Sequence, residues 1–185
     1  MSPGSRRSPS VLLAAAMMMA ALGVSGCGIA ARHEPVPSSA PPSPLATVRP
    51  TIGQTRLQVA GALAASGFQL DTPQVPFRPA ESPALAAAPR MVYQVLLPDD
   101  PTHGFIVVYE FVDPTAAADA GREMAAYLGS GPGRVQFPPD AQHVLRQVGA
   151  TLVLFSWSDA NSPGPDTQKI ALALQSIGSG FAIAR

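Results

Sequence analysis

Three side chains that could bind a divalent cation lie close together in one short segment. Asp99, Asp100 and His103 fall within residues 98–104, which are otherwise Pro, Thr and Gly. Carboxylate oxygens and an imidazole are suitable ligands for a metal ion. The same residue types are also those that a tight connection between two strands requires, and the sequence shows no fourth ligand. We therefore interpret the segment as a turn and predict neither a metal site nor a cofactor.

A second group of candidate site residues is aromatic and lies on three strand-like segments. These residues are Tyr93, Tyr109, Phe155 and Trp157. Successive side chains of a strand point to opposite faces, so alternation puts the aromatic side chains of each segment on one side. If these sides coincide in the sheet, one face is aromatic and the other is aliphatic. Rings with polar tips are common in binding sites, so we predict these four residues as ligand-binding.

The aromatic face would need a cover, and residues 73–89 could provide one. Prolines stand at positions 73, 76, 79, 83 and 89 of this segment. Long segments without regular structure are typical of functional lids or of chain that crosses a surface. Two interpretations therefore stay open, a plain core under a covering loop and a ligand site under a lid.

Known catalytic patterns are not visible in the sequence. We find no nucleophile elbow, phosphate-binding loop, His-Glu-x-x-His motif or dinucleotide-binding glycine pattern. A hydrolase with residues gathered only by the fold is still an alternative. It predicts a cleft at which two or three of five side chains converge, namely Asp99, Asp100, His103, Glu110 and His143. The sequence favours a protein that is not an enzyme without deciding the question.

The N-terminal segment has the pattern of an export signal. Residues 1–10 are polar and carry Arg6 and Arg7, and residues 11–24 form a 14-residue apolar run. Small residues and the one cysteine of the chain, Cys27, follow this run. A basic start, a short apolar run and a small-residue end predict a secretory signal peptide over residues 1–26. The run is shorter than the ~20 apolar residues that cross a bilayer.

Val24, Ser25, Gly26 and Cys27 resemble the lipobox of bacterial lipoproteins, which has an aliphatic residue, two small residues and a cysteine. The resemblance implies that the chain is cleaved before Cys27 and that the thiol carries a diacylglycerol through a thioether. It also implies a mature protein that is anchored in the cell membrane by its lipid and faces the extracytoplasmic side. Two or three acyl chains hold a protein stably at a membrane, whereas one chain does so only marginally.

Composition limits the classes of partner. The first 26 residues hold two of the 12 basic side chains and none of the 12 acidic ones, so residues 27–185 have a formal charge of −2. Without a basic stripe, nucleic acid is not a predicted partner. No cysteine follows Cys27, so the folded part must be stabilised by its core rather than by disulfides.

Residues 27–50 are predicted to be a tether and residues 51–185 a single domain. Six of the 16 residues from 35 to 50 are proline, which fixes φ and removes a backbone donor. Such a segment favours an extended linker over a helix or a strand. The remaining length is typical of one domain with one hydrophobic core.

The domain has the pattern of an α+β fold. Apolar residues at helical spacing predict helices over residues 53–66, 114–128 and 166–177. Apolar runs bounded by turn formers predict strands over residues 91–97, 105–112, 142–148 and 151–158. Short strands are expected around residues 68–70, 135–137 and 181–184. The order α-ββα-ββα predicts an antiparallel sheet of four or more strands with helices packed on one face.

The prediction for function is a lipid-anchored extracytoplasmic binding or interaction domain that is not an enzyme. Its partners would be the membrane, through the lipid, and an envelope protein or a small apolar ligand. Two alternatives stay open, an envelope hydrolase and an accessory subunit of a membrane complex.

Overall fold

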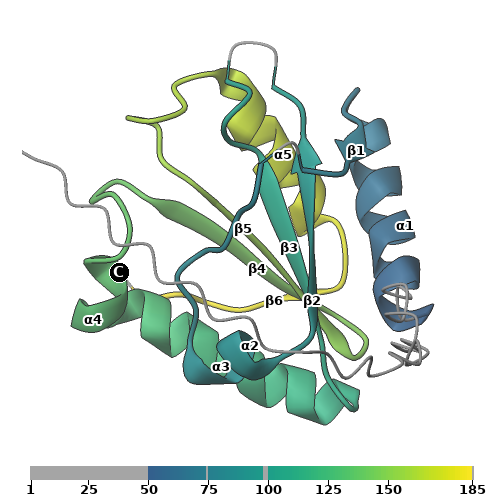
Figure 1. Cartoon of the computed structure of the whole chain (residues 1–185), viewed down its shortest axis with the longest axis vertical. Coiled ribbons are helices and arrows are strands. Elements are labelled where there is room, and N and C mark those ends of the chain that lie inside the picture. The colour runs from purple at the N-terminus through teal and green to yellow at the C-terminus, as the bar shows by residue number, and fades with distance from the viewer. Residues whose placement is uncertain (1–49, 74, 98–99, 185) are drawn as a thin grey trace, which may run out of the picture. The chain divides into compact units, whose positions relative to one another are not determined.

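The computed structural model describes residues 50–73, 75–97 and 100–184. The predicted signal peptide, the tether, Cys27 and Asp99 therefore lie outside the described residues. The described residues belong to one compact unit. Its elements are placed by the apolar patterns and turn residues of the sequence, and they form one sheet with helices on both sides (Figure 1).

The sheet has six strands, all paired antiparallel, in the order β1-β2-β3-β5-β4-β6. The strands are β1 (Leu70–Asp71), β2 (Arg90–Val95), β3 (Phe105–Glu110), β4 (Gln142–Val148), β5 (Thr151–Trp157) and β6 (Ser179–Gly180). The predicted α+β class and antiparallel sheet are confirmed. The last strand covers two residues just before the predicted range of 181–184.

Tight connections form where glycine permits them. Gly149 stands first in the two-residue turn between β4 and β5 and has a φ of 58°. A positive φ of this kind is what a two-residue hairpin turn needs, and glycine adopts it without a steric penalty. Gly104 precedes β3 with a φ of 83°, and a Cβ there would lie 2.3 Å from the carbonyl oxygen of Val95. Glycine is therefore required at this approach to the sheet.

Five helices accompany the sheet. They are α1 (Pro50–Ala64), α2 (Pro83–Ala87), α3 (Pro114–Gly129), α4 (Gly131–Arg134) and α5 (Pro165–Gln175). The start of α3 has residues typical of a helix start, because the Asp113 carboxylate accepts a hydrogen bond of 2.8 Å from the Ala116 amide and Pro114 takes the first turn. The predicted edge strand at residues 135–137 is wrong, since this stretch forms turns after α4.

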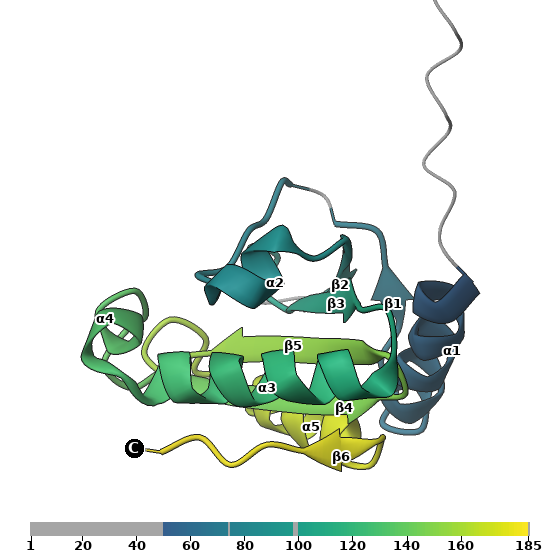
Figure 2. The same ribbon diagram turned by 90° about the horizontal axis from the view of Figure 1, so that it is seen from below.

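Each face of the sheet has its own core. Face 1 carries Tyr93, Ile106, Val108, Val153 and Phe155, and packs against Val59 and Leu63 of α1 and Ile170 and Leu174 of α5. Face 2 carries Val107, Tyr109, Leu145, Leu152 and Leu154, and packs against Ala120, Met124 and Leu128 of α3 and Leu85 of α2. Figure 2 shows α2 and α3 beside the sheet, with α1 at one end.

Helices therefore cover both faces, and the predicted packing on one face is wrong in this respect. The reason lies in the central strands. All six residues of β3 are buried, and five of them, Phe105 to Tyr109, are aliphatic or aromatic, so the strand is enclosed in both directions. A strand of this kind cannot leave one face to solvent, and a second layer has to cover it.

Candidate binding cavity

The structure does not bring the four predicted aromatic residues together. In the β3–β5 pairing, Ile106 lies opposite Phe155 and Tyr109 lies opposite Leu152. Tyr93 lies opposite Ile106 in the neighbouring pair. Residues opposite each other share a face, so Tyr93, Phe155 and Trp157 belong to face 1 and Tyr109 belongs to face 2. There is no single aromatic face.

Face 1 is closed over Tyr93 and Phe155 by regular helices. Tyr93 is 6% exposed and Phe155 is 1% exposed, and the Phe155 and Trp157 rings stack at 5.3 Å. The Arg56 guanidinium of α1 lies 5.8 Å from the centre of the Tyr93 ring. Burial raises the pKa of the Tyr93 hydroxyl, and the Arg56 charge opposes this shift. Within the described residues, this hydroxyl and the Trp157 indole N–H have no hydrogen-bond partner.

Face 2 is covered partly by residues 75–89, which we call the cover segment. The Glu81 carboxylate fixes it to the sheet, because it accepts a hydrogen bond of 2.8 Å from the Tyr109 hydroxyl. Arg90 lies 3.3 Å from the same carboxylate and Arg78 lies 3.2 Å from it, while the Glu81 side chain is 2% exposed. Burial and the bond to Glu81 raise the pKa of Tyr109, so this hydroxyl keeps its proton.

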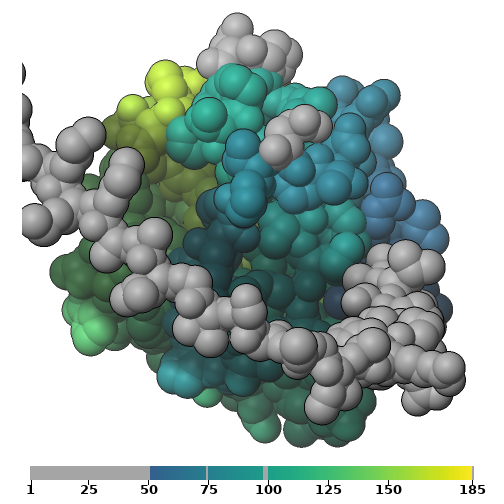
Figure 3. Space-filling view, in the orientation of Figure 1, coloured from purple at the N-terminus to yellow at the C-terminus, as the bar shows by residue number. Residues whose placement is uncertain are grey.

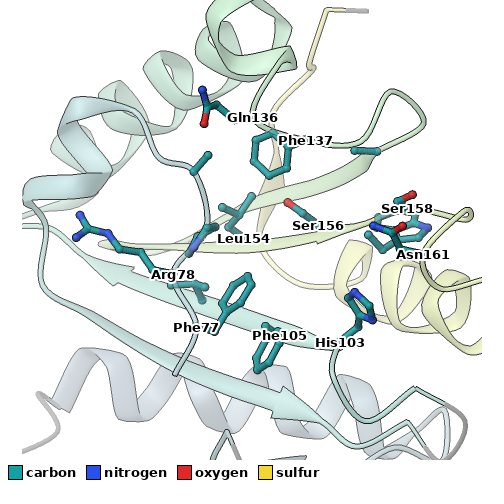
Figure 4. A pocket seen from close by; sticks show the side chains of 15 residues that line it. Phe77, Arg78, His103, Phe105, Gln136, Phe137, Leu154, Ser156, Ser158 and Asn161 are labelled. Atoms are coloured by element: carbon teal, nitrogen blue, oxygen red, sulfur yellow. The ribbon is translucent and has the colours of Figure 1, made fainter. Parts of the chain in front are cut away.

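The cover segment does not close face 2 completely and leaves a cavity of about 250 Å³. The surface recedes beside this segment in the space-filling view (Figure 3). Phe77 of the segment stacks on Phe105 of β3, with 4.2 Å between ring centres and 9° between planes. Phe137 and Leu154 border the same space from the opposite side (Figure 4). The floor of the cavity is therefore aromatic and aliphatic.

Polar side chains gather at one end of the cavity. His103, Ser158 and Asn161 lie near one another there, and Arg78 lies away from them (Figure 4). The Ser158 hydroxyl binds both Asp140 carboxylate oxygens, at 2.7 and 2.8 Å. This bond and the Ala160 amide lower the pKa of Asp140. The aspartate is thus held as a carboxylate directly behind the cavity wall.

His103 is oriented by a second carboxylate. Its Nδ1 lies 2.5 Å from Asp100 Oδ1, and the Ser162 hydroxyl donates to the other Asp100 oxygen. Burial raises the pKa of Asp100, but the bonds from Ser162 and His103 outweigh it and the net shift is downward. Because Asp100 occupies Nδ1, the ring presents Nε2 as its remaining polar atom.

A Ser–His pair lies deeper in the cavity. Ser156 lines the wall, and its hydroxyl oxygen is 2.8 Å from Nδ1 of His143 on the neighbouring strand. Burial lowers the pKa of His143 to about 4, so this imidazole is neutral near pH 7. The edge of its ring meets Phe137, with 4.7 Å between centres. His143 and Phe137 also border a wider groove of about 1020 Å³ between β4, α4 and the last residues of the chain.

Of the five side chains of the hydrolase alternative, Asp99 lies outside the described residues and the other four converge only in part. Asp100 and His103 meet, and His103 lines the cavity. Glu110 stands at the far end of β3 from Phe105, opposite Thr151. His143 binds Ser156 instead of joining the Asp100–His103 pair. Among the described residues, no group of three or more His, Cys, Asp or Glu side chains is placed to hold a metal ion.

Of the four predicted ligand-binding residues, Trp157 lines the cavity and the other three do not. Sequence reasoning missed Phe77, Phe105, Phe137 and Leu154 as its apolar lining. The proline-rich composition around Phe77 indicated a cover but not which side chain it would insert. The sequence predicts an edge strand at Phe137, and an edge strand does not indicate the approach of this side chain to the cavity.

No protein-family model, curated protein or solved structure matches this chain. Within the part of the chain that the structure describes, no helix has the length and apolar character needed to cross a membrane.

Proposed function

We propose that the chain is a lipid-anchored binding domain on the extracytoplasmic side of a bacterial cell envelope, and that it takes a small apolar ligand in the face 2 cavity. The observation that carries the binding role is the aromatic lining contributed by Phe77, Phe105 and Phe137, which come from three separate parts of the chain. The anchor rests on the resemblance of residues 24–27 to a lipobox.

The size of the cavity sets the size of the ligand. A dry apolar cavity of about 150 Å³ binds benzene, and pockets for drug-sized molecules are ~300–1,000 Å³. A volume of about 250 Å³ therefore suits a molecule of one ring or a short branched chain. Apolar lining with a few polar groups at one end is the usual composition of such sites.

A titration with toluene tests the binding role. Both core clusters lie after residue 50, so a Cys27→Ser chain starting at residue 27 contains the whole fold and needs no detergent. We expect toluene to shift the NMR resonances of residues around the cavity. Leu154→Trp should fill the space and abolish the shifts, whereas Leu172→Trp adds the same side chain at an exposed site on α5. Equal shifts in both variants would contradict the assignment.

The anchor has a test of its own. Mass spectrometry of the membrane fraction should find an N-terminus at Cys27 that carries a diacylglycerol. Cys27→Ser should leave the chain unprocessed or release it from the membrane. A retained Met1 or an unmodified Cys27 in the mature wild-type protein would refute the anchor and leave the binding role to stand on the cavity.

A hydrolase is the second candidate, and the Asp100–His103 pair beside the cavity is the observation that favours it. The three serines nearby each form a hydrogen bond with a side chain other than His103. Ser158 binds Asp140, Ser156 binds His143 and Ser162 binds Asp100. A short 4-nitrophenyl ester tests this candidate. Hydrolysis above the buffer rate that is lost in His103→Gln would support it, and a rate equal to buffer would exclude it for this substrate class.

A further inference from the structure

The groups at the polar end of the cavity are set as hydrogen-bond donors or acceptors by the partners that take their hydrogens. Ser158 has one hydroxyl hydrogen, and the two Asp140 oxygens at 2.7 and 2.8 Å take it. The Ser158 oxygen is then left with lone pairs alone for any further partner. A hydroxyl normally acts as donor or acceptor, but this one can only accept.

The Asp100 carboxylate acts on His103 in the same way. Its oxygen lies 2.5 Å from Nδ1, so the neutral imidazole holds its proton on that nitrogen. The Nε2 atom then has a lone pair and no hydrogen. Asp140 and Asp100 thus set the hydrogen positions, and both cavity groups are acceptors when the His103 ring is neutral.

The charges around this end agree with that character. Asp100 and Asp140 carry negative charge next to His103 and Ser158. The positive charge of Arg78 lies at the other side of the cavity and is paired with Glu81 at 3.2 Å. An anionic ligand group would meet acceptors and like charge, whereas a donor would find partners.

We propose that the ligand of this cavity is a small aromatic or branched apolar molecule that carries one hydrogen-bond donor, an alcohol or an amine, and places it between Ser158 and His103. This inference rests on the proposed binding function and specifies its ligand class. The rings of Phe77, Phe105 and Phe137 would hold the apolar part.

Four probes of similar size separate donor recognition from apolar binding. They are 2-phenylethanol, 2-phenylethylamine, the methyl ether of 2-phenylethanol, and 3-phenylpropionate. Dissociation constants would be measured by NMR titration of the Cys27→Ser chain from residue 27 at about pH 8, where an imidazole is ordinarily neutral. We expect the alcohol and the amine to bind about fivefold more tightly than the ether, the factor that one net hydrogen bond gives. The carboxylate should bind most weakly.

A pair of matched variants tests the mechanism. Asp140→Asn supplies an amide N–H that can donate to the Ser158 oxygen, which frees the hydroxyl hydrogen for another partner. It should remove most of the preference for the alcohol over the ether. Asp159→Asn takes the same charge from the neighbouring loop, where the carboxylate binds Gln142 instead, and should leave that preference unchanged. Both aspartates are exposed, so both variants should fold.

The outcomes are distinguishable. Equal binding of alcohol, ether and carboxylate would overturn the donor inference and leave the binding function in place. Tighter binding of 3-phenylpropionate would do the same and would indicate a cationic site. If none of the four probes shifts resonances around the cavity, the donor inference and the proposed function both fail.

Discussion

Face 1 and face 2 are two sides of the same strands, yet one is closed and the other holds a cavity. Face 1 is covered by α1 and α5, whose side chains at helical spacing fill the space over Ile106 and Phe155. Face 2 is covered by α3 on one half and by the cover segment on the other. The cavity lies between the cover segment and the residues that follow α4, over parts of β3 and β5.

The difference shows what each kind of cover can do. A helix presents a continuous apolar stripe and satisfies its own backbone hydrogen bonds. The cover segment is helical only over the short α2 and needs polar anchors elsewhere, here the buried Glu81 carboxylate that binds Tyr109 and Arg90. An anchored segment of this kind leaves gaps between its contacts, and such a gap can serve as a binding site.

Replacing one leucine by alanine on each face is the test of the difference between face 1 and face 2 with the largest expected effect. Leu174→Ala should cost about 3–4 kcal/mol of unfolding free energy, because the side chain is fully buried on the closed face. Leu154→Ala should cost about 2 kcal/mol, since one side of Leu154 already borders empty space and loses fewer contacts.

Urea unfolding of the two variants measures this difference, and the m-values should stay equal to the wild-type value. An equal loss of unfolding free energy in both variants would show that face 2 is packed as tightly as face 1. It would contradict the difference drawn between the two covers.

Detaching the cover segment is the next test. Glu81→Gln keeps an acceptor for Tyr109 but removes the charge that binds Arg90 and Arg78, and it should cost about 2 kcal/mol. Glu123→Gln is the matched control, because this exposed glutamate binds the Ala84 amide of α2 with one oxygen. The control should change the unfolding free energy by less than about 0.5 kcal/mol.

Hydrogen exchange locates the effect of Glu81→Gln. Amides of residues 75–89 should exchange faster while those of α1 and α5 keep their protection. Uniformly faster exchange across both faces would mean that Glu81 stabilises the whole fold rather than one cover.

The smallest expected effect is the pH dependence of stability that His143 contributes. Burial holds the pKa of His143 at about 4, below the 6.5 of an exposed imidazole. As pH falls, this ring is therefore protonated in the unfolded chain before it is protonated in the folded chain. Stability contributed by the neutral ring is present above pH 6.5 and is lost as pH falls toward 4. For this partly exposed ring we expect about 1 kcal/mol of loss.

Urea unfolding at about pH 7 and pH 4.5, for wild type and His143→Gln, isolates this contribution, because the carboxylates titrate alike in both chains. The wild type should lose more stability than the variant. An identical loss would show that the ring is protonated in the folded state without cost.

Local chemistry was enough to predict most elements from the sequence. Asp113 and Pro114 are typical of a helix start, as at α3, and Gly149 is typical of the two-residue turn that joins β4 and β5. Both signals act within a few residues, so no tertiary information is needed to interpret them.

The site needed information that the sequence does not carry. Strand register between β3 and β5 decides which face each ring occupies, and a shift of one residue would reverse the outcome. The contact of Phe77 with Phe105 and the approach of Phe137 depend on how long segments cross the sheet. Such contacts follow from global packing rather than from spacing along the chain.

The strand order has a consequence for how the chain folds. The β2–β3 and β4–β5 pairs each join neighbours in sequence, so they close short loops at little entropic cost. The β3–β5 pair joins strands from different halves of the chain, with α3, α4 and β4 between them in sequence. Non-local pairing of this kind is the slow step in β-rich folds. We therefore expect two hairpins to form early and the β3–β5 pair to set the folding rate, with both faces gaining their covers only after it forms.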